Sequence, residues 1–221
     1  MRSERDAIKL KSYIDKYKLK DIFVTEVEKG ASLFHYEKGE MVMRSGEPVN
    51  HFTILAVGKL RVFSVSEAGK MISIAVEEPP SLFGDIEILL KRDTLHNVVA
   101  ETAVTLIAIP MTLTEQYLEN NVAFYKLACS STIEKLFRSS TSYSFTLLYP
   151  AKNRLARYFL DQGDGELLYH KNKLAEHFGI TPRHLGRLLG EMEKEGMVLR
   201  TGRGRLQVMD AAELKKLAVY Q

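Results

Sequence analysis

The spacing of hydrophobic residues changes along the chain and predicts different elements in successive segments. Within residues 1–20, Leu10, Ile14 and Tyr17 recur at helical spacing, so we expect a polar helix with one apolar stripe. From about residue 22 the pattern becomes a series of short runs rich in Val, Ile, Phe, Leu and Thr. Alternation is clearest in Ile72-Ser73-Ile74-Ala75-Val76, where every second side chain is large and apolar.

These runs predict a set of short β-strands. Glycines separate many of the runs, as expected where turns need positive φ or close backbone approach. Many short strands at regular spacing favour an antiparallel sandwich or a small barrel. The predicted strands are residues 32–36, 40–43, 51–57, 59–65, 71–76, 97–101 and 104–109.

A long helix is expected after Pro110, over residues 112–149, because this stretch contains neither glycine nor proline. Within it, apolar residues recur every seven positions, as in the seam of a coiled coil between two copies of a chain. The alternative is that this face of the helix packs on the β-strands of its own chain. The predicted seam residues are Val122, Cys129, Ile133, Leu136 and Tyr143.

The last third of the chain differs from the rest in charge. From residue 151 onward there are 13 basic and 9 acidic residues, whereas the first 150 residues hold 18 and 19. The net charge of +3 therefore comes entirely from the C-terminal part. This asymmetry is in the direction expected if that part has an anionic partner.

Two short helices with a tight turn are predicted in this basic part, after a helix over residues 151–161. The first spans residues 171–178 and is followed by Gly179, as expected at a left-handed helix end. Thr181-Pro182 then supplies an N-cap hydroxyl and a proline at the first helical position of a helix over residues 182–195. This pattern predicts a helix-turn-helix.

The second of these helices has two different faces. At about 100° per residue, its leucines and Met192 gather on one side, while Arg183 and Arg187 lie on the other. Arginine can donate two parallel hydrogen bonds to guanine in the major groove, so this helix is a candidate for reading DNA. The alternative is that these arginines are simply solvated.

Residues 198–208 predict a β-hairpin with a glycine-rich tip that carries several arginines. Such a wing would contact phosphates, which adds affinity without sequence preference. The residues that we expect at double-stranded DNA are Lys171, Thr181, Pro182, Arg183, His184, Arg187, Arg203 and Arg205.

Four segments together make the chain resemble the Crp/Fnr superfamily of regulators. The resemblance lies in Gly39-Glu40 with Gly46 and the run 51–58, in Ser81-Leu82-Phe83-Gly84-Asp85, in the long helix, and in the run 174–189. It implies an α+β fold with an N-terminal antiparallel β-roll of the cyclic-nucleotide-binding type, a long dimerisation helix and a C-terminal winged helix-turn-helix. The implied domains are residues 1–111, 112–149 and 150–221.

The resemblance also implies a function. Regulators of this family bind pseudo-palindromic promoter DNA as homodimers, and those that activate transcription contact RNA polymerase. The family's base-reading positions match Pro182, Arg183 and Arg187 here. Pro182 and Arg183 depart from the family's usual Arg-Glu, so the family's typical half-site does not transfer. The alternative is a ligand-binding or interaction module whose winged helix does not read DNA.

An effector pocket is implied in the β-roll, with differences from the nucleotide-binding members. Thr94 lies where those members place an arginine against the cyclic phosphate, and Arg92 could replace it only if a gap falls favourably. We therefore expect an effector other than cyclic AMP, or none. The matching pocket residues are Gly84, Asp85, Thr94, Ser139 and Ser140, although the two serines could equally be ordinary exposed residues.

Several function classes are disfavoured by what the sequence lacks. The single cysteine, Cys129, cannot form an intrachain disulfide or hold an iron–sulfur cluster, and it is either an apolar seam residue or an intersubunit disulfide partner. The histidine spacing predicts no metal site, and no nucleophile or phosphate-loop motif appears. We expect no cofactor, no enzymatic activity, no membrane segment or secretory signal, and a cytoplasmic location.

Overall fold

The computed structural model describes residues 1–67, 69, 71–163 and 165–218. The chain forms two compact units. The first consists of Met1–Val65 and Ile74–Phe137, and the second of Ser66–Ser73 and Arg138–Gln221. The long helix α5 (Val122–Leu148) contributes its N-terminal part to the first unit and its C-terminal part to the second.

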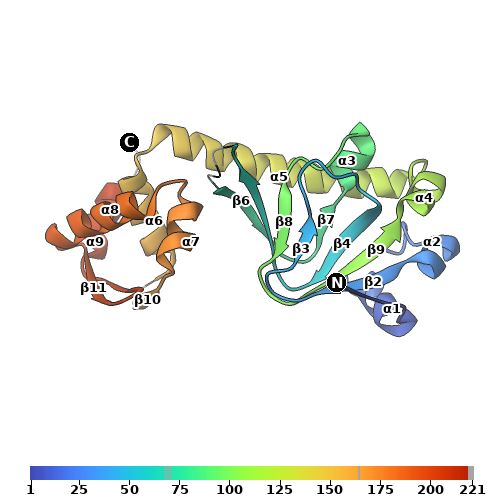
Figure 1. The fold of residues 1–221 in the computed structure, drawn as a ribbon, viewed down its shortest axis with the longest axis horizontal. Coiled ribbons are helices and arrows are strands. Elements are labelled where there is room, and N and C mark those ends of the chain that lie inside the picture. Colours follow the sequence, from blue (N-terminus) through green and yellow to red (C-terminus); the bar gives the residue numbers. More distant parts are fainter. Residues whose placement is uncertain (68, 70, 164, 219–221) are drawn as a thin grey trace. The chain divides into compact units, whose positions relative to one another are not determined.

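The first unit is built around two antiparallel sheets that form a β-roll (Figure 1). The strands of the five-stranded sheet, in spatial order, are β1 (Arg2–Glu4), β2 (Ser32–Tyr36), β9 (Val104–Pro110), β4 (His51–Val57) and β7 (Ser81–Phe83). Those of the four-stranded sheet are β3 (Met41–Met43), β8 (Asn97–Ala100), β5 (Leu60–Val65) and β6 (Met71–Glu77).

Both faces of the five-stranded sheet are buried, because side chains alternate along each strand. On β4, Phe52 and Ile54 belong to the core that the sheet shares with the helices, whereas Leu55 belongs to the core of the roll itself, with Leu60 and Leu106. A one-residue slip in pairing would exchange these two sets, so the apolar pattern fixes the register.

Short helices cover the outer face of this sheet and shape its loops. Leu10 and Ile14 of the first helix and Val27 of the second enter the outer core. Asp6 caps the first helix by accepting a hydrogen bond from the Lys9 amide at 2.9 Å. The helices are α1 (Ala7–Lys16), α2 (Thr25–Gly30) and α3 (Asp85–Leu90).

The single long helix expected over residues 112–149 is interrupted at its start. The chain first forms α4 (Met111–Leu113) and the π-helical turn η1 (Thr114–Leu118), and α5 begins only at Val122. The reason is Asn121, whose Oδ1 accepts hydrogen bonds from the amides of Ala123 at 2.8 Å and Phe124 at 3.3 Å. An Asn side chain that satisfies free amides in this way starts a new helix.

The second unit is a three-stranded antiparallel sheet with helices packed against one another. Its core includes Phe159 and Leu206, which are both almost fully buried. Its elements are α6 (Ala151–Asp161), β10 (Glu166–Leu168), α7 (Lys171–His177), α8 (Pro182–Lys194), β11 (Val198–Gly202), β12 (Arg205–Val208) and α9 (Ala211–Ala218).

The expected α+β architecture is confirmed: a β-roll, a long helix and a winged helix-turn-helix follow one another. All seven predicted strand segments match strands, with bounds within a residue or so. The helix expected within residues 1–20 is present as α1, but it is shorter than that stretch. The residues Arg2–Glu4 before it form a strand that pairs with β2. The missed elements are β1, β7, β10, α2, α3 and α9.

Asn121→Ala should lower the free energy of unfolding by about 1–2 kcal/mol, because two amides of α5 lose their acceptor. The Asn121 side-chain amide also donates to the Asp21 carbonyl at 3.0 Å, so the anchor of the helix to the loop after α1 is lost as well. Urea denaturation measures the change. Ser130→Ala, at an exposed position inside α5, is the control and should leave stability unchanged or slightly raised.

Candidate nucleic-acid interface and pocket turn

The helix-turn-helix is formed by α7 and α8, and local sequence explains the turn between them. Gly179 adopts a φ of 65°, which ends α7 in the left-handed region. The Thr181 hydroxyl then accepts a hydrogen bond from the His184 amide at 3.1 Å, and Pro182 occupies the first turn of α8. The capping predicted from the sequence is therefore present.

Helix α8 separates its side chains as expected. Its buried side consists of Leu185, Leu188, Leu189 and Met192. Arg183 and Arg187 are exposed on the other side. His184 is half-buried, at the boundary between the buried and the exposed side of α8. Because the apolar side is fixed in the core of the unit, the two guanidinium groups are presented to solvent by a rigid element.

The two arginines differ in their surroundings. Arg187 Nη1 forms an ion pair with the Glu191 carboxylate one turn further along α8. No carboxylate of the described residues pairs with Arg183. A base that accepts hydrogen bonds from Arg187 must therefore compete with Glu191, whereas Arg183 is available at once.

The hairpin of β11 and β12 carries Arg203 at its tip. Gly202 pairs with Arg205, so Arg203 and Gly204 form the two-residue turn. Gly204 has a φ of 72°, and a Cβ there would lie 2.7 Å from the Tyr169 carbonyl oxygen, so only glycine fits. The tip is thus held against the chain, with Arg203 exposed.

The other two arginines of the hairpin are paired with carboxylates. Arg205 lies 3.1 Å from Glu166, and Arg200 is paired with Glu193. Side-chain hydrogen bonds from Arg200 lower the pKa of Glu193 below its ordinary value. Among the residues that the structure describes, no carboxylate pairs with Arg203, so it can meet an anion directly, while Arg205 must first leave Glu166.

Lys171, at the start of α7, contacts α8 at Gly186, a residue that was not among the predicted site residues. A Cβ on Gly186 would lie 3.2 Å from Lys171 Nζ, so the ammonium of this α7 residue rests directly on α8 at Gly186. Gly186 inside a helix costs about 1 kcal/mol relative to alanine, and close approach of a neighbour is a reason to retain it. In the sequence, a glycine at position 186 inside a predicted helix was the one sign that a neighbouring residue approaches the helix closely there.

The chain matches known families in both of its parts. A model of the cyclic nucleotide-binding domain matches residues 33–121, and one of the Crp-like helix-turn-helix domain matches residues 153–217. Together, in this order, the two models span the β-roll and the winged helix. The chain belongs to the Crp/Fnr family of transcription regulators. Its winged helix is accordingly a DNA-binding domain, and the family is one of regulators rather than enzymes.

Curated and solved relatives agree with this Crp/Fnr assignment. The regulatory protein YeiL of Escherichia coli O157:H7 is 26% identical over 201 residues, which cover 90% of this chain and 91% of YeiL. The global nitrogen regulator of Nostoc is 26% identical over 176 residues, 74% of this chain and 79% of that protein. A Crp/Fnr-family regulator structure from Eubacterium rectale has a TM-score of 0.79 at 17% identity, over 92% of this chain and 99% of that one, and shows the shared fold.

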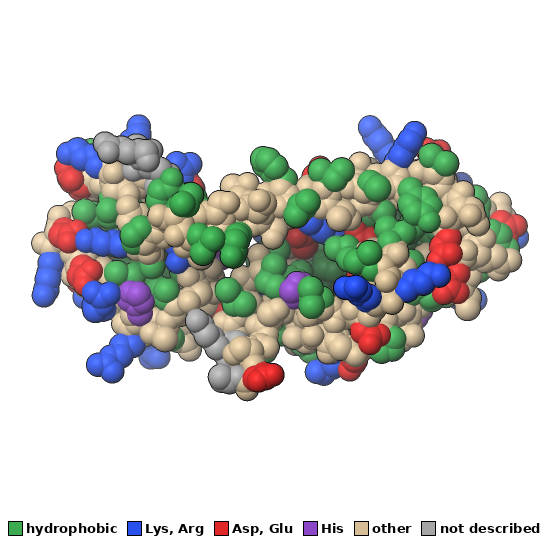
Figure 2. Space-filling view, turned by 90° about the horizontal axis from the view of Figure 1, so that it is seen from above, with side chains coloured by type: hydrophobic (Ala, Val, Ile, Leu, Met, Phe, Trp, Pro, Cys, Tyr) green, Lys and Arg blue, Asp and Glu red, His purple; other side chains and the backbone are tan. Residues whose placement is uncertain are grey.

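The seam residues predicted on α5 are exposed in the single chain. Val122, Ile133, Leu136 and Tyr143 have exposed fractions of 65–68%, and Cys129 is exposed as well. Figure 2 looks onto the side on which α5 lies and shows hydrophobic side chains at this surface. The alternative, that this face packs on the chain's own strands, is not what the described contacts show.

The pocket turn of the β-roll is tied to the long helix by a lysine. Gly84 has a φ of 84° and caps α3, and Asp85 follows with only 2% of its surface exposed. Lys135 Nζ donates to the Leu82 carbonyl at 2.6 Å and lies 3.4 Å from both Asp85 carboxylate oxygens. It also lies 5.5 Å from the centroid of the Phe83 ring. Lys135 was absent from the sequence prediction.

The remaining predicted pocket residues lie elsewhere. Thr94 is buried and lines a cavity at the mouth of the β-roll whose lining includes neither Gly84 nor Asp85. Ser139 and Ser140 are exposed on α5, one turn beyond Lys135. The described residues thus do not form one pocket from the five predicted positions, and the effector site itself stays a prediction.

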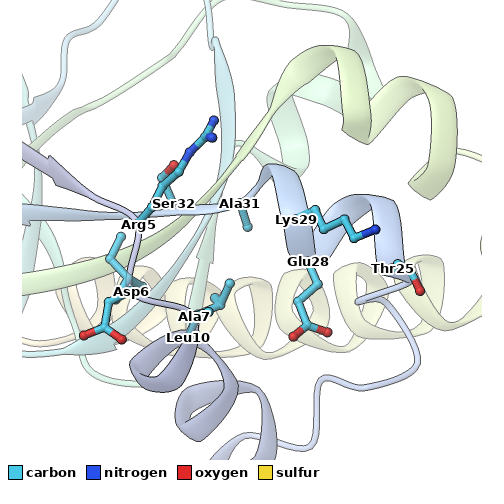
Figure 3. Close-up of a pocket in the computed structure, with 10 residues that line it drawn as sticks. Arg5, Asp6, Ala7, Leu10, Thr25, Glu28, Lys29, Ala31 and Ser32 are labelled. Atoms are coloured by element: carbon cyan, nitrogen blue, oxygen red, sulfur yellow. The ribbon is translucent and has the colours of Figure 1, made fainter.

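A separate hollow lies between α1 and α2 at the surface of the first unit (Figure 3). Its volume is about 380 Å³ and its floor contains Leu10 and Leu33. The Asp6 and Glu28 side chains flank Ala7 and Leu10, but Asp6 is engaged as the cap of α1. Among the described residues, no cluster of His, Cys, Asp and Glu could hold a metal ion, and no helix has the length and apolarity needed to cross a bilayer.

Lys135→Met should lower the free energy of unfolding by roughly 3 kcal/mol near neutral pH, because the buried Asp85 carboxylate loses its cation. Burial already raises the pKa of Asp85, and Lys135 opposes that rise. Asp85 therefore holds its proton more tightly in the folded than in the unfolded chain, so its contribution to stability falls as pH rises from about 4 through the raised pKa.

In Lys135→Met that fall with pH should be steeper, and at acidic pH the variant should approach the stability of the original protein. Thermal unfolding across this pH range provides the measurement. Lys126→Met, at an exposed position of α5, is the matched control. An equal stability loss at every pH would contradict the ion pair as the cause, and Asp85→Asn combined with Lys135→Met should remove most of the pH dependence.

Proposed function

We propose that two copies of this chain join through α5 and bind one DNA duplex with two α8 helices, one in each of two successive major grooves. The observation that supports this dimer best is the exposed apolar seam of α5. The seam residues Val122, Cys129, Leu136 and Tyr143 share one side of the helix, within about 60° of one another at about 100° per residue. Single exposed apolar residues are common, whereas a continuous seam of this kind is typical of an interface.

The other side of α5 is already used, which leaves the seam free for a partner. Phe124 and Ala128 are fully buried against the β-roll, and Lys135 bonds the pocket turn from the same side. These residues point about 120° away from the seam. The helix can therefore stay packed on its own β-roll while its seam pairs with a second copy.

Base reading by the dimer would rest on α8 and affinity on the wing. Pro182, Arg183 and Arg187 occupy the positions expected at base edges, where the two arginines supply hydrogen-bond donors, and Thr181 at the helix start lies beside the DNA backbone. Lys171, Arg203 and Arg205 are proposed to meet phosphates, and His184 lies at the edge of the surface. Binding with sequence preference makes the protein a promoter-specific regulator rather than an interaction module.

Effector control and partners follow from the same proposal. Asp85 is already bonded to Lys135, and Thr94 offers no cation for a cyclic phosphate, so we propose that cyclic AMP is not the effector. A regulator that activates at a promoter would contact RNA polymerase. It would act where the DNA is, in the cytoplasm of a bacterial cell.

Leu136→Glu should weaken dimerisation by roughly 3 kcal/mol or more, because each copy replaces a buried apolar contact with a charge. Sedimentation equilibrium measures the association. Ser130→Glu adds the same charge to α5 about 100° from the seam centre and should leave association unchanged. A chain that is monomeric before mutation at all concentrations, or a Leu136→Glu variant that stays dimeric, would contradict the proposed seam.

Arg187→Ala should weaken specific DNA binding by roughly 1–3 kcal/mol and relax preference at one base pair of each half-site. The preferred site is first selected from random duplexes, and affinities for single-base variants are then compared. Arg157→Ala, which removes an exposed arginine of α6 paired with Asp161, is the matched control. Equal losses on specific and random DNA would assign Arg187 to the backbone instead.

Arg203→Ala should lower affinity for specific and random duplexes alike and reduce the slope of log affinity against log salt by about 1, because one phosphate contact is lost. Filter binding at several salt concentrations gives the slope. A loss confined to the preferred site would show that the hairpin tip contacts bases.

A further inference from the structure

The cavity at the mouth of the β-roll has the properties of a small-molecule site. Its volume is about 300 Å³, the lower end of the range for ligand pockets. It opens beside the turn Arg44–Glu47 and reaches inward to Phe34 and the fully buried Leu106. The Phe34 ring meets His51 edge to face, with centroids 4.9 Å apart. The inner part of the cavity is therefore apolar and aromatic.

The described lining includes one Arg and one Glu side chain, and the amino terminus of Met1, which also lines the cavity, is already paired with Glu40 at 2.8 Å. Arg44 and Glu47 both line the cavity and are both largely exposed, with Arg44 Nε 4.0 Å from the Glu47 carboxylate. This distance is too long for a hydrogen bond, so each group keeps its bonding capacity for another partner. A lone phosphate or dicarboxylate would meet Glu47 as well as Arg44, which disfavours a purely anionic ligand.

The entrance is also held in place. The Gly46 amide donates to the Thr94 carbonyl at 2.7 Å, and the Thr94 amide donates to the Glu47 carbonyl at 3.0 Å. Ser45 adds a side-chain bond to the Leu95 carbonyl at 2.9 Å. Because the turn is fixed before a ligand arrives, little conformational entropy is lost on binding.

We propose that this cavity binds a free α-amino acid with an apolar side chain. The carboxylate of the amino acid would pair with Arg44 and its ammonium with Glu47, while the side chain enters between Phe34 and Leu106. An α-amino acid is the small molecule that presents both charges on neighbouring atoms beside one apolar group, which is the arrangement of this cavity. The proposal concerns the first unit alone and does not depend on dimerisation or DNA binding.

The cavity wall touches the pocket turn, which gives the site a physical link to α5. A Cβ on Gly84 would lie 2.9 Å from Val49 Cγ1 and 3.1 Å from the His51 carbonyl oxygen, and both residues line the cavity. Gly84 precedes Asp85, which Lys135 of α5 contacts. A ligand that displaces Val49 or His51 therefore acts one residue away from the bond between the β-roll and the long helix.

The test is calorimetric titration of the full chain with L-phenylalanine, phenylpropionate and phenethylamine. The last two lack the ammonium and the carboxylate, respectively, so they separate the two charge contacts. We expect L-phenylalanine to bind most tightly. Arg44→Gln should weaken L-phenylalanine and phenylpropionate by at least about fivefold and leave phenethylamine unchanged. Glu47→Gln should do the converse.

Two controls keep the result interpretable. Arg157→Gln, in the second unit, removes an exposed arginine far along the sequence and should change none of the affinities. Val42→Trp, which fills the cavity, should abolish binding, whereas Val57→Trp at the exposed end of β4 should not. Circular dichroism establishes that each variant is folded, and the two charge variants remain as the test if Val42→Trp does not fold.

Three outcomes would overturn the proposal. One is that neither L-phenylalanine nor L-leucine binds at millimolar concentration. A second is binding that Arg44→Gln and Val42→Trp leave unchanged, which would place the ligand elsewhere. A third is phenylpropionate binding as tightly as L-phenylalanine with no effect of Glu47→Gln, which would identify a simple carboxylate as the ligand.

Discussion

The packing of α5 along one of its sides organises the first unit and positions the apolar residues of its other side. Phe124 and Ala128 anchor the helix to the outer core of the β-roll, and Asn121 fixes where it begins. Its other side carries apolar residues that the single chain leaves exposed. A helix anchored on one side and unpartnered on the other can connect a sensing domain to a second copy of the chain.

Lys135 adds a polar contact to this apolar packing. Its ammonium reaches the carbonyl of Leu82 and the carboxylate of Asp85, both in the segment that forms the pocket turn. Buried charges of this kind contribute little net stability, but breaking them is costly, so they favour one arrangement over its neighbours. The position of the turn and that of the helix are therefore coupled, which is what a ligand-responsive regulator of the Crp/Fnr family requires.

In the winged helix, acidic residues modulate a basic surface. Glu191, Glu193 and Glu166 pair with Arg187, Arg200 and Arg205, respectively, whereas Arg183 and Arg203 have no such partner in the described part of the chain. Pairing within the protein lowers the gain from contacting any phosphate, so the proposed DNA surface should bind non-specific duplexes less tightly than five unpaired arginines would. Contacts that reward a particular base become relatively more important, which favours specificity over raw affinity.

Elements whose signals are local could be predicted from the amino-acid sequence. Alternation identified the long strands, the Gly179 to Pro182 turn identified the helix-turn-helix, and the sevenfold repeat identified the outer face of α5. What it missed depends on contacts between distant residues: β1 and β7 are strands because they pair with β2 and β4, and Asn121 interrupts the expected helix because its side chain caps a new one. Tertiary structure alone placed Lys135 against Asp85, Lys171 over Gly186, and Arg44 with Glu47 at the mouth of a cavity. Periodicity reports which face of an element is buried, but it carries no information on which distant side chain meets that face.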